Sequence, residues 1–555
     1  MSASKHHESG EVRIGHSLHT NEWEFAAKRR ENVFQSLQKL EIHCSQNKVP
    51  NIALLGSGGG QRAMVGLLGS LVELDKAGLL DCILYLSGVS GSTWCMASLY
   101  QEPDWSTKLD TVKDKIIKRL SGPGVNLTDA LAKLKKYYYG KDFFSLTDVW
   151  AVMIITTYMK EIDEHTLTDQ WNQHSKDPFP IYTVNDKQSK QEAGVDPWFE
   201  ISPYEAGYSL TGAFVGTSSF GSQFDKGLKK KQQPEMDMLY LQGLCGSALA
   251  GEDELFKSFW EKIKDFLKGS KPTNEINMFE EMKEDPKAPP VEKCYQVLMD
   301  LVDTNLCVLN GKDPSDLHQS IRTNLNELAG GKSQLIFSTQ KLNLADKEAA
   351  KLYIKQYTKD VCNYLSQFSL GPFDLFLSIC KCIVLWIWGR NYNFLQKMTD
   401  ESLPSTLLET ETRDYEDAGL LLNSPYISVL RKERKIDLII SLDFSESDPF
   451  ATVRDTAKMC KKLNISFPEV NILSEDLEKP KDFYVFKGKN VPTVIHIPLF
   501  NVVNCGDDVE TWRNKYRTFQ GPYSAEMITD LLEVAGKNIS NNREKLKEQI
   551  RVVVG

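Results

Sequence analysis

Two strand–turn–helix units follow each other early in the chain, and both turns consist of glycine and serine. Residues 51–55 (NIALL) have the character of a buried strand, lead into a glycine-rich turn at 56–60, and are followed by helical apolar spacing over 62–74. Residues 82–86 (CILYL) form a second predicted strand, followed by GVSGS and another apolar helix pattern. Strand, helix and strand in this order form a βαβ unit, which requires a parallel sheet covered by helices. The pattern predicts an α/β fold.

The rest of the chain predicts one α/β domain whose two halves flank a helical insertion. Residues 291–395 have helical character, and strand character returns with IDLIISL at 436–442. No internal repeat is visible. The expected organisation is an N-terminal tail and amphipathic helix at 1–45, the first half of a catalytic domain at 46–224, a cap at 225–416 and the second half at 417–555.

Composition excludes several classes of protein. Lys and Arg total 66 against 75 Asp and Glu, a net charge of −9, so no global basic field exists to hold nucleic acid. Eleven cysteines without a CxxC pair or zinc spacing, and without a signal peptide, favour free thiols in a reducing compartment. The longest apolar run, 382–388, is far shorter than the roughly 18 residues of a membrane span. We therefore expect a soluble protein with at most peripheral membrane contact.

The glycine turn at 56–60 has three interpretations. A P-loop needs Gly-Lys-Ser/Thr at its end, whereas Gln61 and Arg62 follow Gly60 here. A dinucleotide fingerprint needs a third glycine or alanine where Gln61 stands, and an acid at the end of the second strand. What remains is a turn whose bare amides, at a helix N-terminus, can bind an oxyanion or phosphate. A tight turn without a ligand is the competing interpretation.

Ser90 lies between glycines at the second strand-to-helix junction. A nucleophile elbow requires such neighbours, because its strained backbone leaves no space for side chains. The sequence is G-x-S-G-S, with Ser92 at the position where most α/β-hydrolases have glycine. The alternative is an ordinary glycine/serine loop. The neighbouring glycine turn favours the nucleophile, since adjacent parallel strands bring their C-terminal ends side by side.

A serine nucleophile needs a base, and histidine is the first candidate. None of the nine histidines has a convincing triad pattern, and His496, within an apolar strand, has the character of a core residue. A carboxylate is therefore the better candidate. Asp417 is followed by small residues that allow close backbone approach; Asp414 and Glu416 are its competitors.

Together these motifs resemble the group IV cytosolic phospholipase A2 family, which shares a serine–aspartate dyad with patatin. The resemblance covers roughly residues 20–550. The segments that carry it are GSGGGQRAM, GVSGSTW, DAG, SPYEAG, FGSQF, GLCGSAL, WGRNYNFL, LIISLDFS and HIPLFN. It implies a three-layer α/β lipase domain of the patatin and cytosolic phospholipase A2 type, with a largely helical cap.

The resemblance also implies roles for particular residues. Ser90 matches the nucleophile and Asp417 its base. Gly59 and Gly60 match the oxyanion-hole glycines.

Two arginines are implied to contact the substrate. Arg62 matches an arginine proposed to hold the substrate phosphate, and Arg434 falls where the family has another functionally implicated arginine.

The activity implied is calcium-independent hydrolysis of glycerophospholipid acyl esters through an acyl-enzyme, with lysophospholipase or transacylase activity and no metal or cofactor. About 45 residues precede the first strand, too few for a calcium-binding C2 module, as in the gamma type of the family; the C-terminal prenylation box of that type is absent. A catalytically silent lipid-binding protein on the same fold is the alternative. The expected location is cytoplasmic and peripheral to intracellular membranes, with phospholipid as partner, no nucleic acid and no obligate protein partner.

Two segments are candidates for docking on a membrane. The run KGLKKK at 226–231 could attract anionic lipid, and the strongly apolar segment 373–388 could enter a bilayer surface. A solvated lysine loop and a core helix are the respective alternatives.

Overall fold

The computed structural model describes residues 12–247, 252–269, 291–331, 341–368 and 370–555. The chain divides into two compact units. The first consists of Met1–Gly124, Ile155–Ala248 and Gly389–Gly555, and the second of Val125–Ile154 and Leu249–Trp388. Of the N-terminal segment expected at 1–45, residues 1–11 lie outside the described residues, and Thr20–Lys39 form helix α1.

Buried apolar runs form the parallel centre of a sheet in the first unit. β2 (Ile52–Gly56) pairs in parallel with β3 (Tyr85–Gly88) on one side and β12 (Leu438–Asp443) on the other. β12 also pairs in parallel with β14 (Thr493–Pro498). A strand covered by helices on both faces is apolar along its whole length, which is why these runs show no polar alternation.

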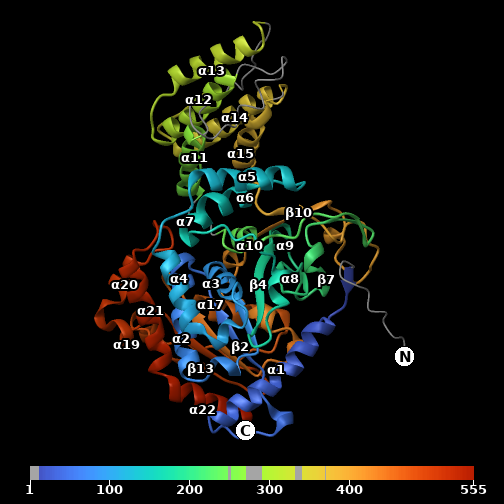
Figure 1. Cartoon of the computed structure of the whole chain (residues 1–555), viewed down its shortest axis with the longest axis vertical. Helices are drawn as coiled ribbons and strands as arrows, with labels where there is room; N and C mark the ends of the chain where they lie inside the picture. The colour runs from blue at the N-terminus through green and yellow to red at the C-terminus, as the bar shows by residue number, and fades with distance from the viewer. Residues whose placement is uncertain (1–11, 248–251, 270–290, 332–340, 369) are drawn as a thin grey trace. The chain divides into compact units, whose positions relative to one another are not determined.

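Mostly antiparallel strands extend this centre on both sides (Figure 1). Among the described residues the sheet has twelve strands, in the order β1-β7-β6-β5-β4-β3-β2-β12-β14-β13, with β11 joining β4 to β10. The flanking strands are β1 (Val12–Ile14), β4 (Phe179–Asp186), β5 (Trp198–Ile201), β6 (Glu205–Tyr208), β7 (Ala213–Gly216), β10 (Arg390–Tyr392), β11 (Thr412–Asp417) and β13 (Tyr484–Phe486). A separate hairpin consists of β8 (Gln223–Asp225) and β9 (Leu228–Lys231).

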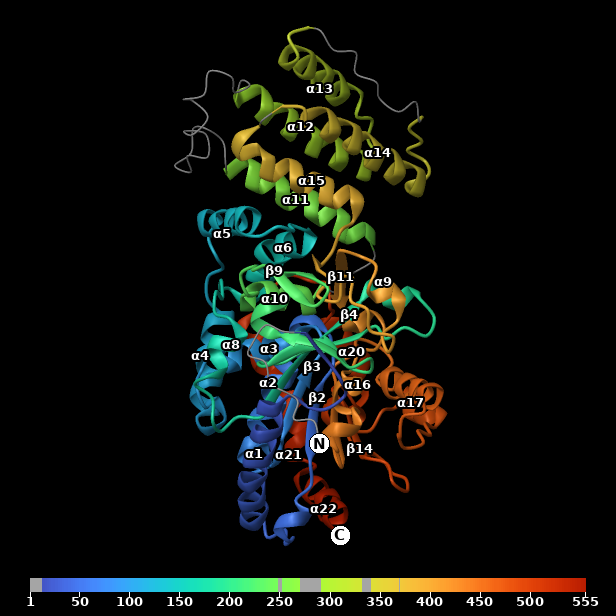
Figure 2. The ribbon, with the colours of Figure 1, turned by 90° about the vertical axis from the view of Figure 1, so that its right-hand side faces the viewer.

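Helices cover both faces of this sheet, so the predicted α/β fold is confirmed. Figure 2 shows α2 (Gly60–Lys76) and α4 (Leu109–Leu120) on one side of β2 and β3, and α17 (Ala451–Leu463) on the other. α2 and α21 (Ala525–Ser540) meet backbone to backbone, because a Cβ at Gly69 would lie 2.5 Å from the Leu532 carbonyl oxygen. The helices of this unit besides α1 are α2 (Gly60–Lys76), α3 (Gly91–Tyr100), α4 (Leu109–Leu120), α7 (Thr156–Met159), α8 (Leu167–Trp171), α9 (Lys187–Gln191), α10 (Met238–Cys245), α16 (Tyr426–Val429), α17 (Ala451–Leu463), α18 (Ser474–Glu478), α19 (Val502–Cys505), α20 (Val509–Lys515), α21 (Ala525–Ser540) and α22 (Arg543–Val554).

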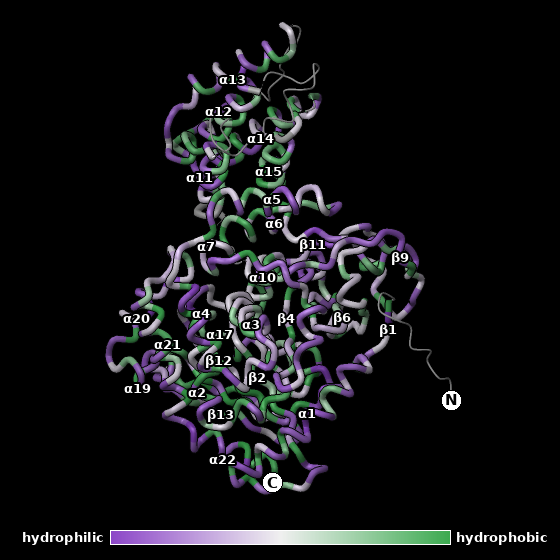
Figure 3. The backbone as a smooth tube through the Cα atoms, in the orientation of Figure 1, coloured by the Kyte–Doolittle hydropathy of each residue, from purple (hydrophilic) through white to green (hydrophobic). Residues whose placement is uncertain are grey.

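The second unit is helical and has its own apolar core. Its helices are α5 (Leu127–Gly140), α6 (Leu146–Trp150), α11 (Glu252–Gly269), α12 (Val291–Leu309), α13 (Ser315–Leu328), α14 (Lys347–Leu365) and α15 (Asp374–Leu385). The apolar segment 373–388 supplies α15, whose Phe376 and Ile379 are fully buried, while Leu385 is 56% exposed. Most of this segment is therefore core, which disfavours it as a docking surface (green stretch at α15 in Figure 3).

The second unit differs in its boundaries from the cap expected at 225–416. Residues 389–416 belong to the first unit because β10 and β11 pair with each other and β11 pairs with β4. Residues 125–154 belong to the second unit because α5 and α6 pack on α11 and α15. Strand pairing decides the first difference and helix packing the second, and neither is visible as a change of composition.

A buried ion cluster ties α1 to the sheet. The Nη2 atom of Arg434 lies 2.9 Å from Glu22 Oε1 on α1 and 2.5 Å from Glu200 Oε2 on β5. Arg431 adds a second ion pair to Glu200 at 3.2 Å, and the Tyr85 hydroxyl donates to Glu22. Burial by itself would raise the pKa of Glu200, but the two arginines lower it to about 2. Glu200 stays ionised because the two arginines compensate its charge inside the protein.

Arg434→Met is expected to lower the free energy of unfolding by about 3–5 kcal/mol, because it leaves a buried carboxylate without its cation. Chemical denaturation measures this loss. Arg513→Met, which removes a cation from a surface pair with Glu510, is the control and should cost less than about 1 kcal/mol. Equal losses in the two variants would contradict a structural role for Arg434.

Candidate active site

Ser90 occupies a strained turn between β3 and α3. Its backbone has φ 52° and ψ −122°, outside the regions that residues with a Cβ ordinarily adopt. Such strain costs about 1–3 kcal/mol and persists where the surroundings impose it. Gly91 allows the turn, because a Cβ there would lie 1.9 Å from the Gly60 carbonyl oxygen. The geometry is that of the elbow predicted from G-x-S-G-S.

Hydrogen bonds join the elbow to the glycine turn. The Ser92 hydroxyl donates to the Ser57 carbonyl at 2.6 Å, and the Ser57 hydroxyl accepts from the Phe444 amide at 2.7 Å. Ser92, which departs from the usual hydrolase pattern, thus makes a buried bond that a glycine could not. The Ser90 Oγ itself is buried and has no hydrogen bond of ordinary geometry among the described residues.

The glycine turn presents amides at the start of α2. Gly59 has φ 151° and Gly60 φ 56°, both in the region that favours glycine. Among the described residues, no acceptor is bonded to the amide of either glycine. Gly58 lies beside the elbow, since a Cβ there would be 3.1 Å from the Ser90 Cβ. The predicted nucleophile and the predicted oxyanion-binding amides therefore lie together.

Asp417 ends β11 and is buried. It lies opposite Val184 on β4, the strand next to β3. Its Oδ1 accepts from the Gly419 amide at 2.8 Å, and its Oδ2 has no hydrogen-bond partner among the described residues. Burial raises the pKa of the Asp417 carboxyl to about 7, although the Gly419 amide and the Ser90 hydroxyl each lower it. The elbow and the loop after Asp417 are neighbours, since a Cβ at Gly419 would lie 3.5 Å from the Val89 Cγ1. Asp417 can take a proton near neutral pH.

Asn423 joins the glycine turn to the loop after Asp417. Its carbonyl accepts from the Gly58 amide at 2.9 Å, and its Nδ2 donates to the Gly58 carbonyl at 3.2 Å and to the Ser445 hydroxyl at 2.9 Å. A Cβ at Gly419 would be 3.2 Å from the Asn423 Oδ1. No motif in the sequence points to this positioning residue. Asn in NSPY reads as an ordinary turn residue, and only the fold brings it to Gly58.

Arg62 supports the glycine turn from behind. It is 1% exposed, and its guanidinium donates to the carbonyls of Phe444 at 2.6 Å and Tyr516 at 2.7 Å and to the Thr518 hydroxyl at 3.2 Å. A Cβ at Gly59 would lie 2.9 Å from the Arg62 Nη2. Contact with a substrate phosphate stays a prediction, and this geometry favours a supporting role instead.

Arg434 is not brought to this site. It precedes β12 and, with the ion cluster described above, lies toward the amino ends of the parallel strands, whereas Ser90 follows the carboxyl end of β3. Its donors bond Glu22, Glu200 and the Ser428 carbonyl. The substrate-binding role predicted for Arg434 does not fit this placement.

No described histidine contacts Ser90, and His6 and His7 lie outside the described residues. His496 is a core residue, as the sequence indicates: its Nδ1 lies 3.1 Å from the Ser441 Oγ and its Nε2 2.6 Å from the Pro449 carbonyl oxygen. Within the residues that the structure describes, no three His, Cys, Asp or Glu side chains gather in a group able to hold a metal ion.

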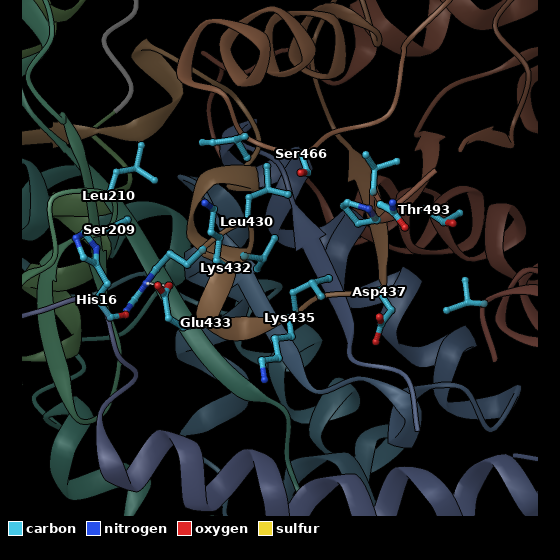
Figure 4. A pocket seen from close by; sticks show the side chains of 18 residues that line it. His16, Ser209, Leu210, Leu430, Lys432, Glu433, Lys435, Asp437, Ser466 and Thr493 are labelled. Carbon is cyan, nitrogen blue, oxygen red and sulfur yellow. Dashed lines mark hydrogen bonds and ion pairs between the residues drawn. The ribbon is translucent and has the colours of Figure 1, made fainter. Parts of the chain in front are cut away.

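A cavity of about 760 Å³ lies elsewhere in the first unit (Figure 4). It is found at the amino ends of β12 and β14, where Asp437 and Thr493 line it, and no predicted site residue is in its wall. Ser90 does not line this cavity.

Comparisons with known proteins show the family and the fold of the chain. A family model described as "Lysophospholipase catalytic domain" matches residues 52–289. Cytosolic phospholipase A2 gamma of Mus musculus is 33% identical over 561 residues, spanning 95% of this chain and 90% of that protein. The protein of that name from Homo sapiens is 32% identical, spanning 99% and 97%. A solved structure, human GIVD cytosolic phospholipase A2, matches with TM-score 0.65 at 22% identity, covering 99% of this chain and 69% of that one, so the two share the fold.

Arg62→Lys is expected to lower the free energy of unfolding by about 2 kcal/mol, because one ammonium cannot reach three fixed acceptors. Turnover of acyl esters with and without a phosphate should fall by the same factor, since the glycine turn is displaced for both. Denaturation curves and parallel assays on the two substrates measure these effects, with Arg513→Lys as the surface control. A loss confined to the phosphate-bearing ester would restore the phosphate-binding role.

Proposed function

Because the chain belongs to the cytosolic phospholipase A2 family, we propose that it hydrolyses glycerophospholipid acyl esters through a Ser90–Asp417 dyad, without calcium. The observation that carries the proposal is the strained elbow, whose buried Ser90 hydroxyl is unpartnered among the described residues and lies near the buried Asp417 carboxyl, with its pKa raised to about 7. A base with this pKa can take a proton from serine at neutral pH without a histidine.

The first half-reaction forms an acyl-enzyme. Asp417 accepts the proton of the Ser90 hydroxyl, whose oxygen attacks the ester carbonyl carbon. The amides of Gly59 and Gly60 stabilise the negative oxygen of the tetrahedral intermediate, and one such donor contributes about 3 kcal/mol in measured hydrolases. The intermediate collapses as the C–O bond of the ester breaks, and protonated Asp417 returns its proton to the leaving lysophospholipid oxygen.

The second half-reaction releases the acyl group. Asp417 takes a proton from a water molecule, whose oxygen attacks the acyl-enzyme, and the fatty acid leaves as Ser90 regains its proton. A lysophospholipid hydroxyl in place of water gives transacylation, and a lysophospholipid in place of the first substrate gives lysophospholipase activity. Each step uses groups already present at the site, so the mechanism needs no metal ion.

The proposal includes a cytoplasmic protein that binds membranes peripherally. None of the helices in the described part of the chain combines the length and apolar character that a membrane span needs. The phospholipid substrate resides in a bilayer, so some surface of the protein must reach it. A silent lipid-binding protein on the same fold is disfavoured, because such a protein has no use for a strained elbow and a buried carboxylate with a raised pKa.

Product analysis tests the proposal. A phospholipid with different labelled acyl chains at its two positions is incubated with the protein in the presence of calcium or of a chelator. Release of the sn-2 acyl chain at equal rates in both conditions is the expected result. Release only with calcium would overturn the calcium-independent mechanism, and no release of any acyl chain would overturn the enzymatic function.

Ser90→Ala and Asp417→Ala are each expected to lower the turnover number at least about 1,000-fold. The double variant should be scarcely worse than either, because the two side chains act as a unit. Single-turnover assays on a soluble short-chain ester measure this, and Glu416→Ala, which removes the neighbouring carboxylate, is the control. Substantial turnover by Asp417→Ala would require another base.

The dyad predicts opposite effects of pH on activity and stability. Turnover needs ionised Asp417, so it should rise through pH 7 and fall about tenfold per unit below it. The pKa is higher in the folded protein than in the unfolded chain, so the carboxyl costs stability as pH rises from about 4 through 7.

Asp417→Asn mimics the protonated acid. It should raise the free energy of unfolding by up to about 4 kcal/mol at pH 8 and leave it unchanged near pH 4. Thermal or chemical denaturation at the two pH values measures the difference. A stabilisation independent of pH would contradict the raised pKa.

A further inference from the structure

The β8–β9 hairpin presents a cationic surface with an apolar tip. Asp225 pairs with Leu228 across a two-residue turn, in which Lys226 has φ 53° and Gly227 φ 81°. Positive φ at both central residues is typical of the two-residue turns whose twist matches that of the strands in a β-hairpin. We call residues 223–231 the basic hairpin.

Leu228 is the apolar tip of the basic hairpin, with 62% of its surface exposed. Every residue of β9 is exposed, and so is Lys226 on the other side of the tip. The described contacts of Lys229 are to neutral groups, the Gln232 Oε1 at 2.5 Å and the Ser219 hydroxyl at 3.4 Å. Four exposed lysines therefore lie within three positions of an exposed leucine, an arrangement that suits an anionic, partly apolar surface.

The base of the hairpin is fixed in the first unit. Phe224 is fully buried, and the Lys226 amide donates to the Gln396 carbonyl at 3.0 Å. The loop at 396–398 lies beside the tip, because a Cβ at Gly227 would be 3.6 Å from the Met398 Cε. Lys397 in this loop is exposed and adds a further cation. A rigid base means that the hairpin loses little conformational freedom when it binds.

The basic hairpin lies toward the end of the unit that holds the dyad. Phe220, three residues before β8, packs against Tyr415 on β11 with ring centroids 5.4 Å apart, and Asp417 follows two residues later. Figure 3 shows β9 and β11 at the same end of the first unit. A surface bound by the hairpin would therefore face that end of the unit.

We propose that the basic hairpin docks the protein on anionic bilayers, with Leu228 entering the interface and the surrounding lysines among the headgroups. The inference rests on the proposed function, which requires a substrate held in a bilayer. Attraction to an anionic leaflet contributes about fivefold in binding per lysine near the surface, and burial of one leucine side chain about tenfold. The competing segment, 373–388, has most of its apolar side chains in the core of the second unit.

Binding is measured by cosedimentation with vesicles, in a Ser90→Ala background so that the lipid stays intact. Vesicles of phosphatidylcholine alone are compared with vesicles containing about 30% phosphatidylserine, with a chelator present throughout. The protein should bind the anionic vesicles at least about 100-fold more tightly, and this preference should shrink as salt rises. Equal binding to both vesicles, or a requirement for calcium, would overturn the proposal.

Matched variants assign the binding to the hairpin. Lys229→Glu/Lys230→Glu/Lys231→Glu should weaken binding at least about 100-fold and Leu228→Asp about tenfold. Lys458→Glu/Lys461→Glu/Lys462→Glu, on exposed positions of α17, is the control for charge, and Leu473→Asp, at a leucine 66% exposed, is the control for the tip. Hairpin variants that bind like the controls would overturn the assignment.

A soluble short-chain ester separates this inference from the proposed function. With Ser90 intact, the hairpin variants should hydrolyse it at the wild-type rate while losing activity on anionic vesicles. Loss on both substrates would mean that the hairpin supports the site and is not a docking element. A wild-type protein that binds vesicles through the hairpin but hydrolyses neither substrate would overturn the proposed function alone.

Discussion

The contact of Gly91 with Gly60 sets the spacing on which the rest of the site depends. Neighbouring strands lie about 4.8 Å apart, whereas packed helices need about 8–10 Å between their axes. α2 and α3 start at the ends of the adjacent strands β2 and β3, so their first turns are closer than side chains allow. Glycine resolves the conflict, since a Cβ on Gly91 would coincide with the Gly60 carbonyl. The strained Ser90 and the amides of the glycine turn are brought together by this one constraint.

Much of the fold could be predicted because its signals are local. Buried parallel strands are apolar throughout, and the closely packed turns between these strands and their helices require glycine. NIALL, CILYL and the two glycine-containing turns therefore reveal the centre of the sheet. The edges of the units carry no such signal. β10 and β11 join the sheet through pairing with β4, and a short strand that pairs with a distant segment looks like loop in the sequence.

The same distinction between local and long-range signals applies to the residues of the site. Ser90 and the glycines could be predicted locally, because a strained turn requires these residue types. Asp417 could be distinguished from Asp414 and Glu416 only through the resemblance to the family. Asn423 could not be found, because its partner Gly58 lies 365 positions earlier. For the two arginines the sequence suggested a contact with substrate that the structure does not favour. The buried guanidinium of Arg62 bonds backbone carbonyls, and that of Arg434 bonds carboxylates. The acceptors that an arginine contacts depend on tertiary packing, which short sequence motifs do not reveal.

The supports of the glycine turn come from the far end of the chain. Arg62 is held by Tyr516 and Thr518, and Gln61 accepts from the Tyr523 amide. A ribosome releases the glycine turn and Ser90 early, hundreds of residues before these partners and before Asp417. A nascent chain therefore carries the elbow before the residues that support the glycine turn and before Asp417, so the proposed site can form only after the second half of the chain has been made.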